Sequence, residues 1–565
     1  MKHIKVILKE NYKVISLYIV TGLIIAFLTN YKDIYFQQVV DNFTNHSLTM
    51  KNIVTYGILL TSFYLMNYID EYPAKKLENG IYLDFKLLAL KKISKIPFIT
   101  YRSLGTGKLT QRIENGAQAG KQILFDYWLC VIRQLLPTIL FSIWFIWKID
   151  PRIAYFILAG YVVVFIVTNI LLKMLYKMKE KILYNEEMFN HYLVRGFMEM
   201  VVFRLNRRFP EEIKKATVAK REIVNAKVKM NMIHEAFFSI FACIVALLDL
   251  GVLLFAWKYQ AISVGSVIAL LALIENAYTP IAIVNVLFVQ YKLDKETYER
   301  FSQFLEVKDD EQLEQGESIP SYRGEIIIKN LTFQYNQHSI FQNLNMVVHP
   351  GEKIALVGTS GSGKTTCIEL LLGLLKYDQG SILIDGVELK EIKLNNFYEN
   401  VSYISQEAPI FDGTIKENLV YNQSSHKEEI YEALRKVELL DTVNKMEQGI
   451  DTVIGERGMT LSGGERQRLA LARLWFQKND IVILDEATSA LDTITEEKVM
   501  NQVMELLADK TVIAIAHRLS SVKEFDRILV FQNGEIVEEG TFAELLRKDS
   551  YFKELYYKNI YQSNE

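Results

Sequence analysis

Long uncharged apolar stretches recur through the first half of the chain. The first of them, Val14–Tyr31, contains no charged residue and is long enough to cross a bilayer as a helix. Five more stretches of similar character follow, each with at most a single charge: Ile53–Ile69, Tyr127–Trp147, Ile153–Leu172, Ala236–Trp257 and Tyr259–Tyr291. Because a soluble core could not house so many apolar helices, the pattern predicts a polytopic α-helical membrane domain with six transmembrane helices.

Positive charges are unevenly distributed between these stretches. Four lysines precede the first stretch, and two long connections, Lys75 to Lys121 and Lys173 to Lys229, are densely basic. The remaining connections hold few cations, such as Lys148 and Arg152. By the positive-inside bias, we expect both termini and the two long connections in the cytoplasm. The apolar positions of these connections keep a helical period, which predicts that the helices extend beyond the lipid.

The pattern changes after residue 301. Residues 302–324 are acidic and polar with little apolar period, and we interpret them as a linker. Short apolar runs then alternate with helical segments, which predicts an α/β domain with a parallel sheet. The predicted strands are Glu325–Tyr335, Ile340–Val348, Lys353–Val357, Ser381–Ile384, Val401–Ser405, Ile481–Leu484, Thr511–Ala516 and Arg527–Gln532. The predicted domains are therefore a membrane domain (1–301), the linker (302–324) and an α/β domain (325–565).

A glycine-rich sequence, GTSGSGKTT at Gly358–Thr366, follows one predicted strand and opens a helix. It fits the phosphate-loop pattern G-x-x-x-x-G-K-[ST], in which backbone N–H groups and a helix N-terminus hold phosphate oxygens. In this pattern Lys364 contacts the β- and γ-phosphates of ATP, and the Thr365 hydroxyl contacts Mg²⁺. The other predicted nucleotide-binding residues of the loop are Gly358, Ser360, Gly361, Ser362, Gly363 and Thr366.

A second stretch, Leu461–Asp492, supplies acids for the same chemistry. It contains a Ser-Gly-Gly turn, an arginine- and alanine-rich helix, and the apolar run Ile481–Leu484, which ends at Asp485 and Glu486. A buried strand would deliver both carboxylates to the carboxyl edge of the sheet. We predict that Asp485 holds Mg²⁺ together with Thr365 and that Glu486 polarises the attacking water. The predicted reaction is in-line hydrolysis of ATP.

The phosphate loop and this second stretch together resemble the nucleotide-binding domain of ATP-binding-cassette (ABC) proteins. Six predicted spans followed by one such domain are similar to the layout of an exporter-type half-transporter. The resemblance implies catalytic roles for Gln406, which would sense the γ-phosphate and reach the metal, and for His517, which would contact the γ-phosphate. It also implies that Tyr335 stacks on adenine and that Asp492 closes a loop at a dimer interface.

The Ser-Gly-Gly turn, Ser462 to Gly464, has an intermolecular role in this family. The resemblance implies that Ser462, Gly463 and Gly464 cap the γ-phosphate bound to a second subunit, at the N-terminus of their helix. Because one chain carries one phosphate loop and one such turn, we expect two chains in the working unit. A homodimer is consistent with the intact catalytic residues, and a heterodimer with another half-transporter stays open.

Contacts between the ATPase and the membrane domain are also implied by the resemblance. Two turns of the long cytoplasmic connections would sit on the ATPase, and their positions by layout are near Glu114–Gly120 and Val202–Pro210. The segment Gly455–Gly458, GERG, resembles an exporter-specific contact with these turns.

Three charges lie inside the predicted spans: Arg133, Asp249 and Glu275. Each costs about 2.5–3.5 kcal/mol near the centre of a membrane helix, so each needs a partner, water or a role. Arg133 is near the cytoplasmic side, where we expect its side chain to snorkel to the interface. For the two acids, a solvated transport path and a structural contact between helices stay open, including a buried pair of one acid with Arg133. Pro280 frees the carbonyl of Asn276, so an acceptor-rich cavity would favour a cationic amphipathic guest.

These observations predict a multi-pass protein of the cytoplasmic membrane that uses ATP and Mg²⁺ to export amphipathic drugs, lipids or peptides. Import of a metal chelate by the same architecture is the alternative, because sequence motifs do not set direction. The formal net charge of −2 gives no overall attraction to nucleic acid, and we predict no nucleic-acid partner. Three cysteines predict no disulfide framework, and none has the spacing of metal ligands.

Overall fold

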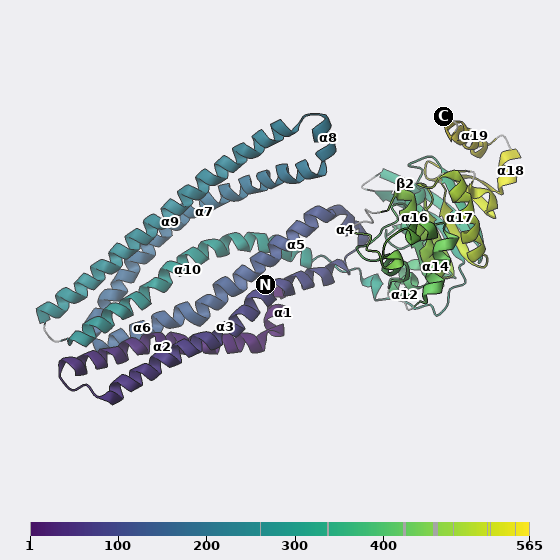
Figure 1. Cartoon of the computed structure of the whole chain (residues 1–565). Coiled ribbons are helices and arrows are strands. Elements are labelled where there is room, and N and C mark those ends of the chain that lie inside the picture. The colour runs from purple at the N-terminus through teal and green to yellow at the C-terminus, as the bar shows by residue number, and fades with distance from the viewer. Residues whose placement is uncertain are drawn as a thin grey trace. The chain divides into compact units, whose positions relative to one another are not determined.

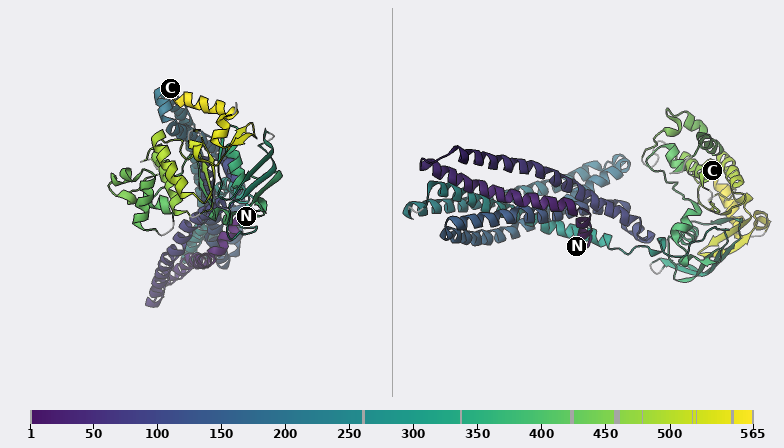
Figure 2. Two further views of the ribbon diagram at one scale, coloured as in Figure 1. Left: turned by 90° about the vertical axis from the view of Figure 1, so that its right-hand side faces the viewer. Right: turned by 90° about the horizontal axis from the view of Figure 1, so that it is seen from below.

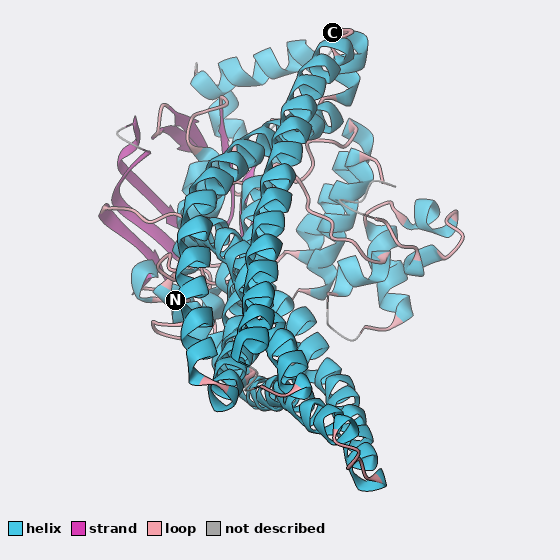
Figure 3. Ribbon diagram, turned by 90° about the vertical axis from the view of Figure 1, so that its left-hand side faces the viewer, coloured by secondary structure: helices cyan, strands magenta, loops and turns pink. Residues whose placement is uncertain are grey.

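The computed structural model describes residues 2–259, 262–335, 338–421, 425–455, 461–477, 479–516, 518–519, 521–547 and 550–563. Contacts within the chain divide it into two compact units. The first comprises Met1–Ser94 and Leu104–Val307, and the second comprises Lys95–Ser103 and Lys308–Glu565. Long helices make up the first unit, and the second combines helices with strands (Figure 1). Figure 3 shows this difference by colour, with the magenta strands gathered in the second unit.

The helices of the first unit are long and run side by side (Figure 2). In chain order they are α1 (Lys2–Glu10), α2 (Tyr12–Thr44), α3 (Met50–Ile93), α5 (Thr106–Lys121), η1 (Gln122–Leu129), η2 (Val131–Leu135), α6 (Leu136–Ile149), α7 (Pro151–Met198), α8 (Met200–Leu205), α9 (Phe209–Tyr259) and α10 (Val264–Leu305). The elements from α5 to α6 follow one another without a break in the helix, and η1 and η2 are π-helical. The predicted polytopic helical fold is therefore confirmed, although the last long helix begins at Val264 and not at Tyr259.

Helices of the first unit have the length and composition of membrane spans. Among the described residues, four helical segments meet both criteria: Tyr12–Thr44, Gly107–Ile149, Phe209–Lys258 and Val264–Leu305. The other two long helices, α3 and α7, contain 44 and 48 residues and include the predicted stretches Ile53–Ile69 and Ile153–Leu172. The unit thus has six helical segments long enough to cross a bilayer.

Side chains from four helices form a core in the first unit. Phe145 of α6, Ile157 of α7, Leu248 of α9 and Tyr278 of α10 are buried in one cluster. By contrast, only 17% of the most apolar 18-residue stretch of α9 is buried, and side chains such as Leu254 are exposed. Such an exposed apolar surface is expected where helices contact lipid.

An ion pair between Arg133 and Asp70 lies inside this unit. Both residues are buried, with 8% and 7% of their surface exposed. Arg133 Nη2 pairs with Asp70, Arg133 Nη1 donates to the Tyr18 hydroxyl at 2.9 Å, and the Thr21 hydroxyl donates to Asp70 at 2.5 Å. The predicted snorkelling of Arg133 is therefore wrong, and so is its pairing with an acid of the fifth or sixth span. Asp70, the partner of Arg133, directly follows the predicted second span and therefore was not among the charges inside the predicted spans.

The predicted turn at Glu114–Gly120 is wrong, because these residues lie inside α5. The two glycines of this segment allow close helix packing instead of a turn. A Cβ at Gly116 would lie 2.3 Å from the Phe301 side chain, and a Cβ at Gly120 would lie 2.7 Å from the Phe85 ring. The absent side chains therefore let α3 and α10 approach α5.

The chain instead leaves the first unit between Ser94 and Leu104. The nine residues Lys95–Ser103 belong to the second unit and include most of α4 (Phe98–Leu104). Gly105, with φ of 70°, precedes α5 and permits the change of direction. The other predicted turn, at Val202–Pro210, is present between α8 and α9.

Two sheets organise the second unit. A four-stranded antiparallel sheet has the order β2-β1-β4-β5, and a six-stranded sheet has the order β10-β9-β3-β8-β7-β6. In the larger sheet, the neighbours from β9 to β6 pair in parallel, and only β10 is antiparallel. The strands are β1 (Ile326–Tyr335), β2 (His338–Val348), β3 (Lys353–Gly358), β4 (Gln379–Ile384), β5 (Val387–Glu388), β6 (Val401–Ile404), β7 (Ile481–Asp485), β8 (Thr511–Ile515), β9 (Arg527–Gln532) and β10 (Glu535–Gly540). The predicted α/β fold with a parallel sheet is confirmed.

Alternate residues of the central strands face two separate cores. Val482 and Leu484 of β7 join one apolar cluster, whereas Ile481 and Ile483 join the other. This explains why the strand is apolar at every position, as expected for a sheet covered on both faces. The helices that follow the first strands of this unit are α11 (Lys364–Leu371), α12 (Leu394–Glu399), α13 (Ile415–Val420), α14 (Lys427–Lys436), α15 (Leu440–Asn444), α16 (Gly463–Ala472), α17 (Thr493–Leu506), α18 (Phe542–Arg547) and α19 (Tyr551–Ser563).

The predicted linker contributes to both units. Its first residues complete α10, which ends at Leu305, and its later residues form η3 (Glu311–Leu313) in the second unit. Ile319 and Tyr322 are buried in the core beside the antiparallel sheet. Although the segment is polar overall, these two side chains therefore pack it into the core of the second unit.

Candidate functional site

The predicted catalytic residues converge on one edge of the six-stranded sheet. Strands β3, β6, β7 and β8 run in parallel, so their carboxyl ends lie at the same edge. The phosphate loop follows β3, Gln406 follows β6, and Asp485 and Glu486 stand at the end of β7. His517 follows β8 in sequence but lies outside the described residues.

Lys364 lies within the phosphate loop. Only 9% of its surface is exposed, and Nζ donates to the carbonyl oxygens of Gly358 at 2.8 Å and Thr359 at 2.9 Å. Burial lowers the pKa of Lys364, and the nearby carboxylates of Asp485 and Glu486 oppose this effect. A partly desolvated ammonium beside the N-terminus of α11 makes this loop suited to an anion.

Two glycines shape the loop. Gly361 has φ of 82° and Gly363 has φ of 105°, in the region that glycine adopts without strain. A Cβ at Gly363 would also lie 2.7 Å from the Phe341 ring. Any other residue at Gly363 would therefore distort the start of α11.

Asp485 has the surroundings of a metal ligand. Only 4% of its surface is exposed, and its carboxylate accepts from the Tyr403 hydroxyl at 3.5 Å. Burial, followed by the charge of Glu486, raises the pKa of Asp485 to about 6. Two neighbouring carboxylates and the Thr365 hydroxyl at the start of α11 offer the hard oxygen ligands that Mg²⁺ prefers. The chemistry of these residues therefore fits Mg²⁺.

Glu486 has an unusual backbone conformation. Its φ is 49°, a left-handed value that non-glycine residues rarely adopt outside turns and functional sites. The backbone turns directly after β7, and Gln406 Nε2 donates to Glu486 Oε2 at 2.6 Å. The structure thus brings together Gln406 and Glu486, which the sequence placed 80 residues apart.

Ser462 begins α16. Its hydroxyl accepts from the Glu465 N–H at 3.3 Å, and the Glu465 carboxylate accepts from the Ser462 N–H at 2.7 Å. A Cβ at Gly464 would lie 3.0 Å from the Ala490 carbonyl oxygen, so a side chain there would crowd the following loop. Among the described residues, no hydrogen bond joins this turn to the phosphate loop of the same chain.

Gln467 contacts several of these segments, although no motif in the sequence singles it out. It is 4% exposed, and its Nε2 donates to the Ser489 hydroxyl at 3.0 Å and to the Gln406 carbonyl oxygen at 3.4 Å. Its Oε1 accepts from the Ala490 N–H at 2.8 Å. A polar residue among the buried positions of α16 was the only feature that could have indicated this role.

Asp492 caps the next helix, α17, by accepting from the Thr495 N–H at 3.0 Å.

Tyr335 ends β1 close to the phosphate-loop helix. Its hydroxyl donates to Glu369 Oε2 at 3.1 Å, and its ring packs edge-on against Phe333 with centroids 4.9 Å apart. Burial, followed by the charge of Glu369, raises the pKa of the Tyr335 hydroxyl. The predicted contact at Gly455–Gly458 is outside the described residues except for Gly455.

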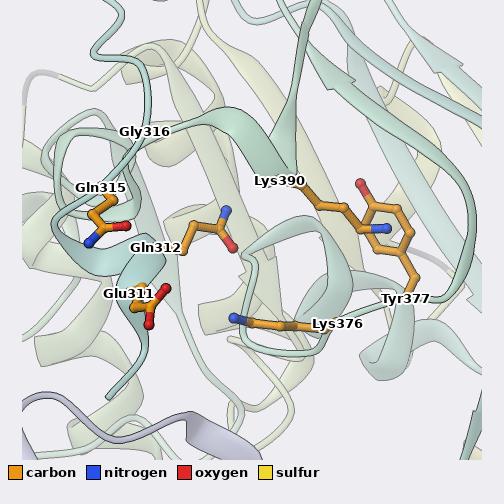
Figure 4. A pocket seen from close by; sticks show the side chains of 7 residues that line it. All are labelled: Glu311, Gln312, Gln315, Gly316, Lys376, Tyr377 and Lys390. Carbon is orange, nitrogen blue, oxygen red and sulfur yellow. The ribbon is translucent and has the colours of Figure 1, made fainter. Parts of the chain in front are cut away.

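A pocket of about 470 Å³ lies elsewhere on the second unit. It is lined by Glu311, Gln312, Gln315, Gly316, Lys376, Tyr377 and Lys390, and Figure 4 shows the first three side chains facing the lysines and the tyrosine. Lys376 pairs with Asp310 at 2.9 Å, and Gln312 donates to the Leu389 carbonyl oxygen at 2.6 Å. These contacts hold Asp310 and Gln312 of the predicted linker against Lys376 and Leu389 of the second unit, and none of the lining residues is a predicted site residue.

The two acids of the predicted spans, Asp249 of α9 and Glu275 of α10, lie in the helical unit. Asp249 is partly buried, with no hydrogen-bond partner on Oδ1 among the described residues, and Glu275 is exposed. Next to Glu275, the Asn276 amide donates to Asp33 at 2.8 Å. This hydrogen bond joins α10 to α2.

Known proteins share these features. Residues 341–489, which include the phosphate loop and both acids of β7, match the ABC transporter family. The second unit contains an ABC transporter domain. Over 299 residues the chain is 33% identical to the uncharacterized ABC transporter ATP-binding protein YwjA of Bacillus subtilis, covering 52% of each protein. It is 41% identical over 249 residues to an ATP-dependent lipid A-core flippase of Methylobacillus flagellatus, covering 43% of each. A flippase of the same description from Haemophilus influenzae is 42% identical over 238 residues, which are 41% of this chain and 40% of the flippase.

The chain spans about half the length, or less, of these curated relatives. A solved structure extends the fold comparison to the whole chain: a bacterial Atm1-family ABC exporter with ATP bound has a TM-score of 0.80 at 21% identity. That match covers 98% of both chains. The whole chain therefore has the fold of that exporter, and four of its described helices are long and apolar enough to cross a membrane.

Proposed function

We propose that this ABC transporter chain is one half of an ATP-driven exporter in the cytoplasmic membrane. The observation that carries the proposal is the convergence of Lys364, Gln406, Asp485 and Glu486 on one sheet edge. The exporter fold of the whole chain supports it, as do relatives described as ATP-dependent flippases. In this proposal the membrane domain comprises residues 1–301, the linker 302–324 and the ATPase 325–565.

Nucleotide binding follows from the geometry of the phosphate loop. The N–H groups of Gly361 to Thr366 and the Lys364 ammonium would hold the phosphates, and the Tyr335 ring would stack on adenine. Thr365 and Asp485 would hold Mg²⁺, with Gln406 beside them. When bound, Mg²⁺ neutralises phosphate charge and helps to orient the phosphates for in-line attack.

Hydrolysis depends on Glu486. Its carboxylate would accept a proton from the attacking water, and the amide of Gln406, which already contacts it, would orient this water or the γ-phosphate. His517 would contact the γ-phosphate from the neighbouring strand. Together these groups confine the reaction to water rather than to a protein hydroxyl.

The second subunit completes the site in this proposal. Ser462, Gly463 and Gly464 would cap the γ-phosphate bound by the other chain, because the N–H groups at the start of α16 are suited to an anion. Asp492 would lie at the same interface. We propose a homodimer, since this chain carries every catalytic residue. Co-expression of two inactive variants of this chain distinguishes a homodimer from a heterodimer.

The proposed cargo is an amphipathic molecule with lipid-like character. Flippase relatives support a lipid, and the acceptors near Asp249 and Glu275 favour a molecule with a cationic group. Import of a metal chelate stays the alternative for direction. The positive charges of the predicted connections favour an ATPase in the cytoplasm.

Phosphate release by the purified full-length chain in lipid tests this proposal. Glu486→Gln should lower the rate about a hundredfold or more, because glutamine keeps the shape but cannot accept the proton. Binding of a fluorescent ATP analogue should stay within the parent range. Glu505→Gln, which changes an exposed glutamate of α17, is the matched control. A Glu486→Gln rate equal to that of the control would exclude Glu486 as the base.

A further inference from the structure

A short segment between α3 and α5 belongs to the ATPase unit. Lys95–Ser103 leaves the helical unit and joins the second unit, where the Lys95 carbonyl oxygen accepts from the Asp310 N–H at 2.7 Å. Both ends of this segment continue into long helices of the first unit. Any contact that the segment makes with the nucleotide site could therefore act on α3 and α5.

Glu369 provides such a contact. It lies on α11, four residues after Thr365, and its side chain is only 13% exposed. Arg102 Nη1 donates to Glu369 Oε1 at 3.2 Å and to Oε2 at 3.4 Å. The Tyr335 hydroxyl donates to the same Oε2 at 3.1 Å. One carboxylate thus joins α4, the phosphate-loop helix and the end of β1.

We propose that Glu369 is a positioning residue that orients Tyr335 for the adenine base and transmits its occupancy to Arg102 and α4. This inference rests on the proposed binding of ATP. It adds that the contact of Tyr335 with adenine is linked to the helical unit. Glu369 and Arg102 touch neither the phosphates nor the metal in this proposal. They act only through Tyr335 and through the segment Lys95–Ser103.

The physical basis is the restriction of one aromatic ring. A tyrosine ring has two side-chain torsions, and a hydrogen bond from its hydroxyl to a fixed carboxylate limits both of them. The Arg102 guanidinium also donates to this carboxylate. A ring held in this way loses less entropy when a base stacks on it, so removal of the bond should weaken ATP binding more than catalysis.

The same contacts predict little effect on folding. Arg102 has 61% of its side chain exposed, and ion pairs with an exposed partner contribute little to stability. The contribution of this pair should therefore appear in nucleotide affinity and in the response of α4. A purely structural role would instead appear in thermal unfolding.

The first test measures the KM for ATP and kcat of the full-length chain. Tyr335→Phe removes only the hydroxyl, and Glu369→Leu removes the acceptor while keeping an apolar stem. Each should raise KM roughly three- to tenfold with kcat within about twofold, the size expected for one hydrogen bond. The double variant should resemble the single variants, because both remove the same bond. Glu505→Gln is the exposed control.

The second test compares two probes of the phosphate loop by hydrogen exchange of residues 95–104. A non-hydrolysable ATP analogue should slow exchange in the parent, whereas inorganic tripolyphosphate, which has no base, should not. The difference between the probes should disappear in Tyr335→Phe, in Glu369→Leu and in Arg102→Gln.

Three results separate the possible failures. Additive effects of Tyr335→Phe and Glu369→Leu on KM, or an unchanged response of residues 95–104 in both, would overturn this inference. If Glu369→Leu fails to fold, Tyr335→Phe alone decides, because it removes no buried charge. A parent chain that does not hydrolyse ATP would instead contradict the proposed function.

Discussion

At the scale of single residues, the buried charge of Arg133 is held by partners from other helices. Arg133 of η2 meets Asp70 of α3 and the Tyr18 hydroxyl of α2, and its guanidinium also lies 4.0 Å from the centre of the Tyr18 ring. Gly22 makes room for it, since a Cβ there would lie 2.0 Å from Arg133 Cγ. The pair therefore ties three helical segments together at one point.

Removal of one partner of this pair should destabilise the helical unit. Asp70→Asn or Arg133→Met leaves an uncompensated buried charge or polar group, and we expect a loss of about 3 kcal/mol in the free energy of unfolding. The double variant Asp70→Leu with Arg133→Met should recover much of this loss, because it buries no lone charge. Thermal unfolding of the full-length chain in detergent measures both effects.

The matched control is Arg152→Met. Arg152 also pairs with an aspartate, Asp150 at 2.8 Å, but 62% of its side chain is exposed. Its loss should cost less than about 1 kcal/mol. Equal midpoints for Asp70→Asn and Arg152→Met would show that burial of the Arg133 pair has no energetic consequence.

A motif with fixed spacing allows the sequence to predict which residues meet at one edge of the sheet. Lys364, Asp485 and Gln406 stand in recognisable patterns, and the parallel strands explain why such distant residues meet. Glu369 and Gln467 have no such pattern, because each is a single polar residue on a helix. Their roles depend on which chain segment packs opposite them, and a sequence pattern does not contain that information.

At the scale of elements, apolar periodicity identified the long helices but not their internal geometry. The stretch Tyr127–Trp147 gives no sign of π-helical turns, yet Gln122–Leu129 and Val131–Leu135 are π-helical. The turn near Glu114–Gly120 was placed from the layout of the family alone, and the sequence does not show that Gly116 and Gly120 serve close helix contacts. Only the neighbouring helices decide between these two uses of glycine.

The turn at Val202–Pro210 contains both a buried and an exposed apolar side chain. Phe203 of α8 is 4% exposed and packs against Phe209, with ring centroids 5.8 Å apart, whereas Leu205 is 77% exposed. Both residues lie in the turn for which the family resemblance implies a contact with the ATPase. Phe203 is instead part of the hairpin's own packing.

Leu205→Ser should therefore test coupling without unfolding the hairpin. We expect basal ATP hydrolysis to stay within about twofold of the parent, because exposed substitutions rarely change stability by more than about 0.5 kcal/mol. Stimulation of hydrolysis by a cationic amphipathic dye should fall, because the proposed contact with the ATPase is lost. Val201→Ser, at another exposed position of α8, is the control. Full stimulation in Leu205→Ser would place the coupling contact elsewhere.

At the scale of the whole molecule, the turn at Ser462 and the phosphate loop are the two halves of the proposed ATP site, and no hydrogen bond joins them among the described residues of one chain. The turn at Ser462 caps its own helix, and the phosphate loop holds its own lysine. In the proposed function a second chain completes the site. The sequence predicts such a partner but not its identity.

Co-expression of two inactive chains tests the proposed homodimer. A Lys364→Ala chain lacks the phosphate contact, and a Ser462→Arg chain lacks the cap. Mixed dimers would keep one complete site, so we expect about a quarter of the parental hydrolysis rate from random pairing of two such chains. Phosphate release from the purified mixture measures this. A rate no higher than the sum of the two inactive chains would contradict a site shared between subunits.

Transport into proteoliposomes tests the central claim most directly. The full-length chain is reconstituted with ATP on the side of the ATPase, and a fluorescent phospholipid and a cationic amphipathic dye serve as probes. The proposed function predicts ATP-dependent movement of at least one probe away from the ATPase side, and predicts that Glu486→Gln abolishes it. Movement of both probes at the same rate in parent and Glu486→Gln vesicles, or only toward the ATPase side, would contradict ATP-driven export.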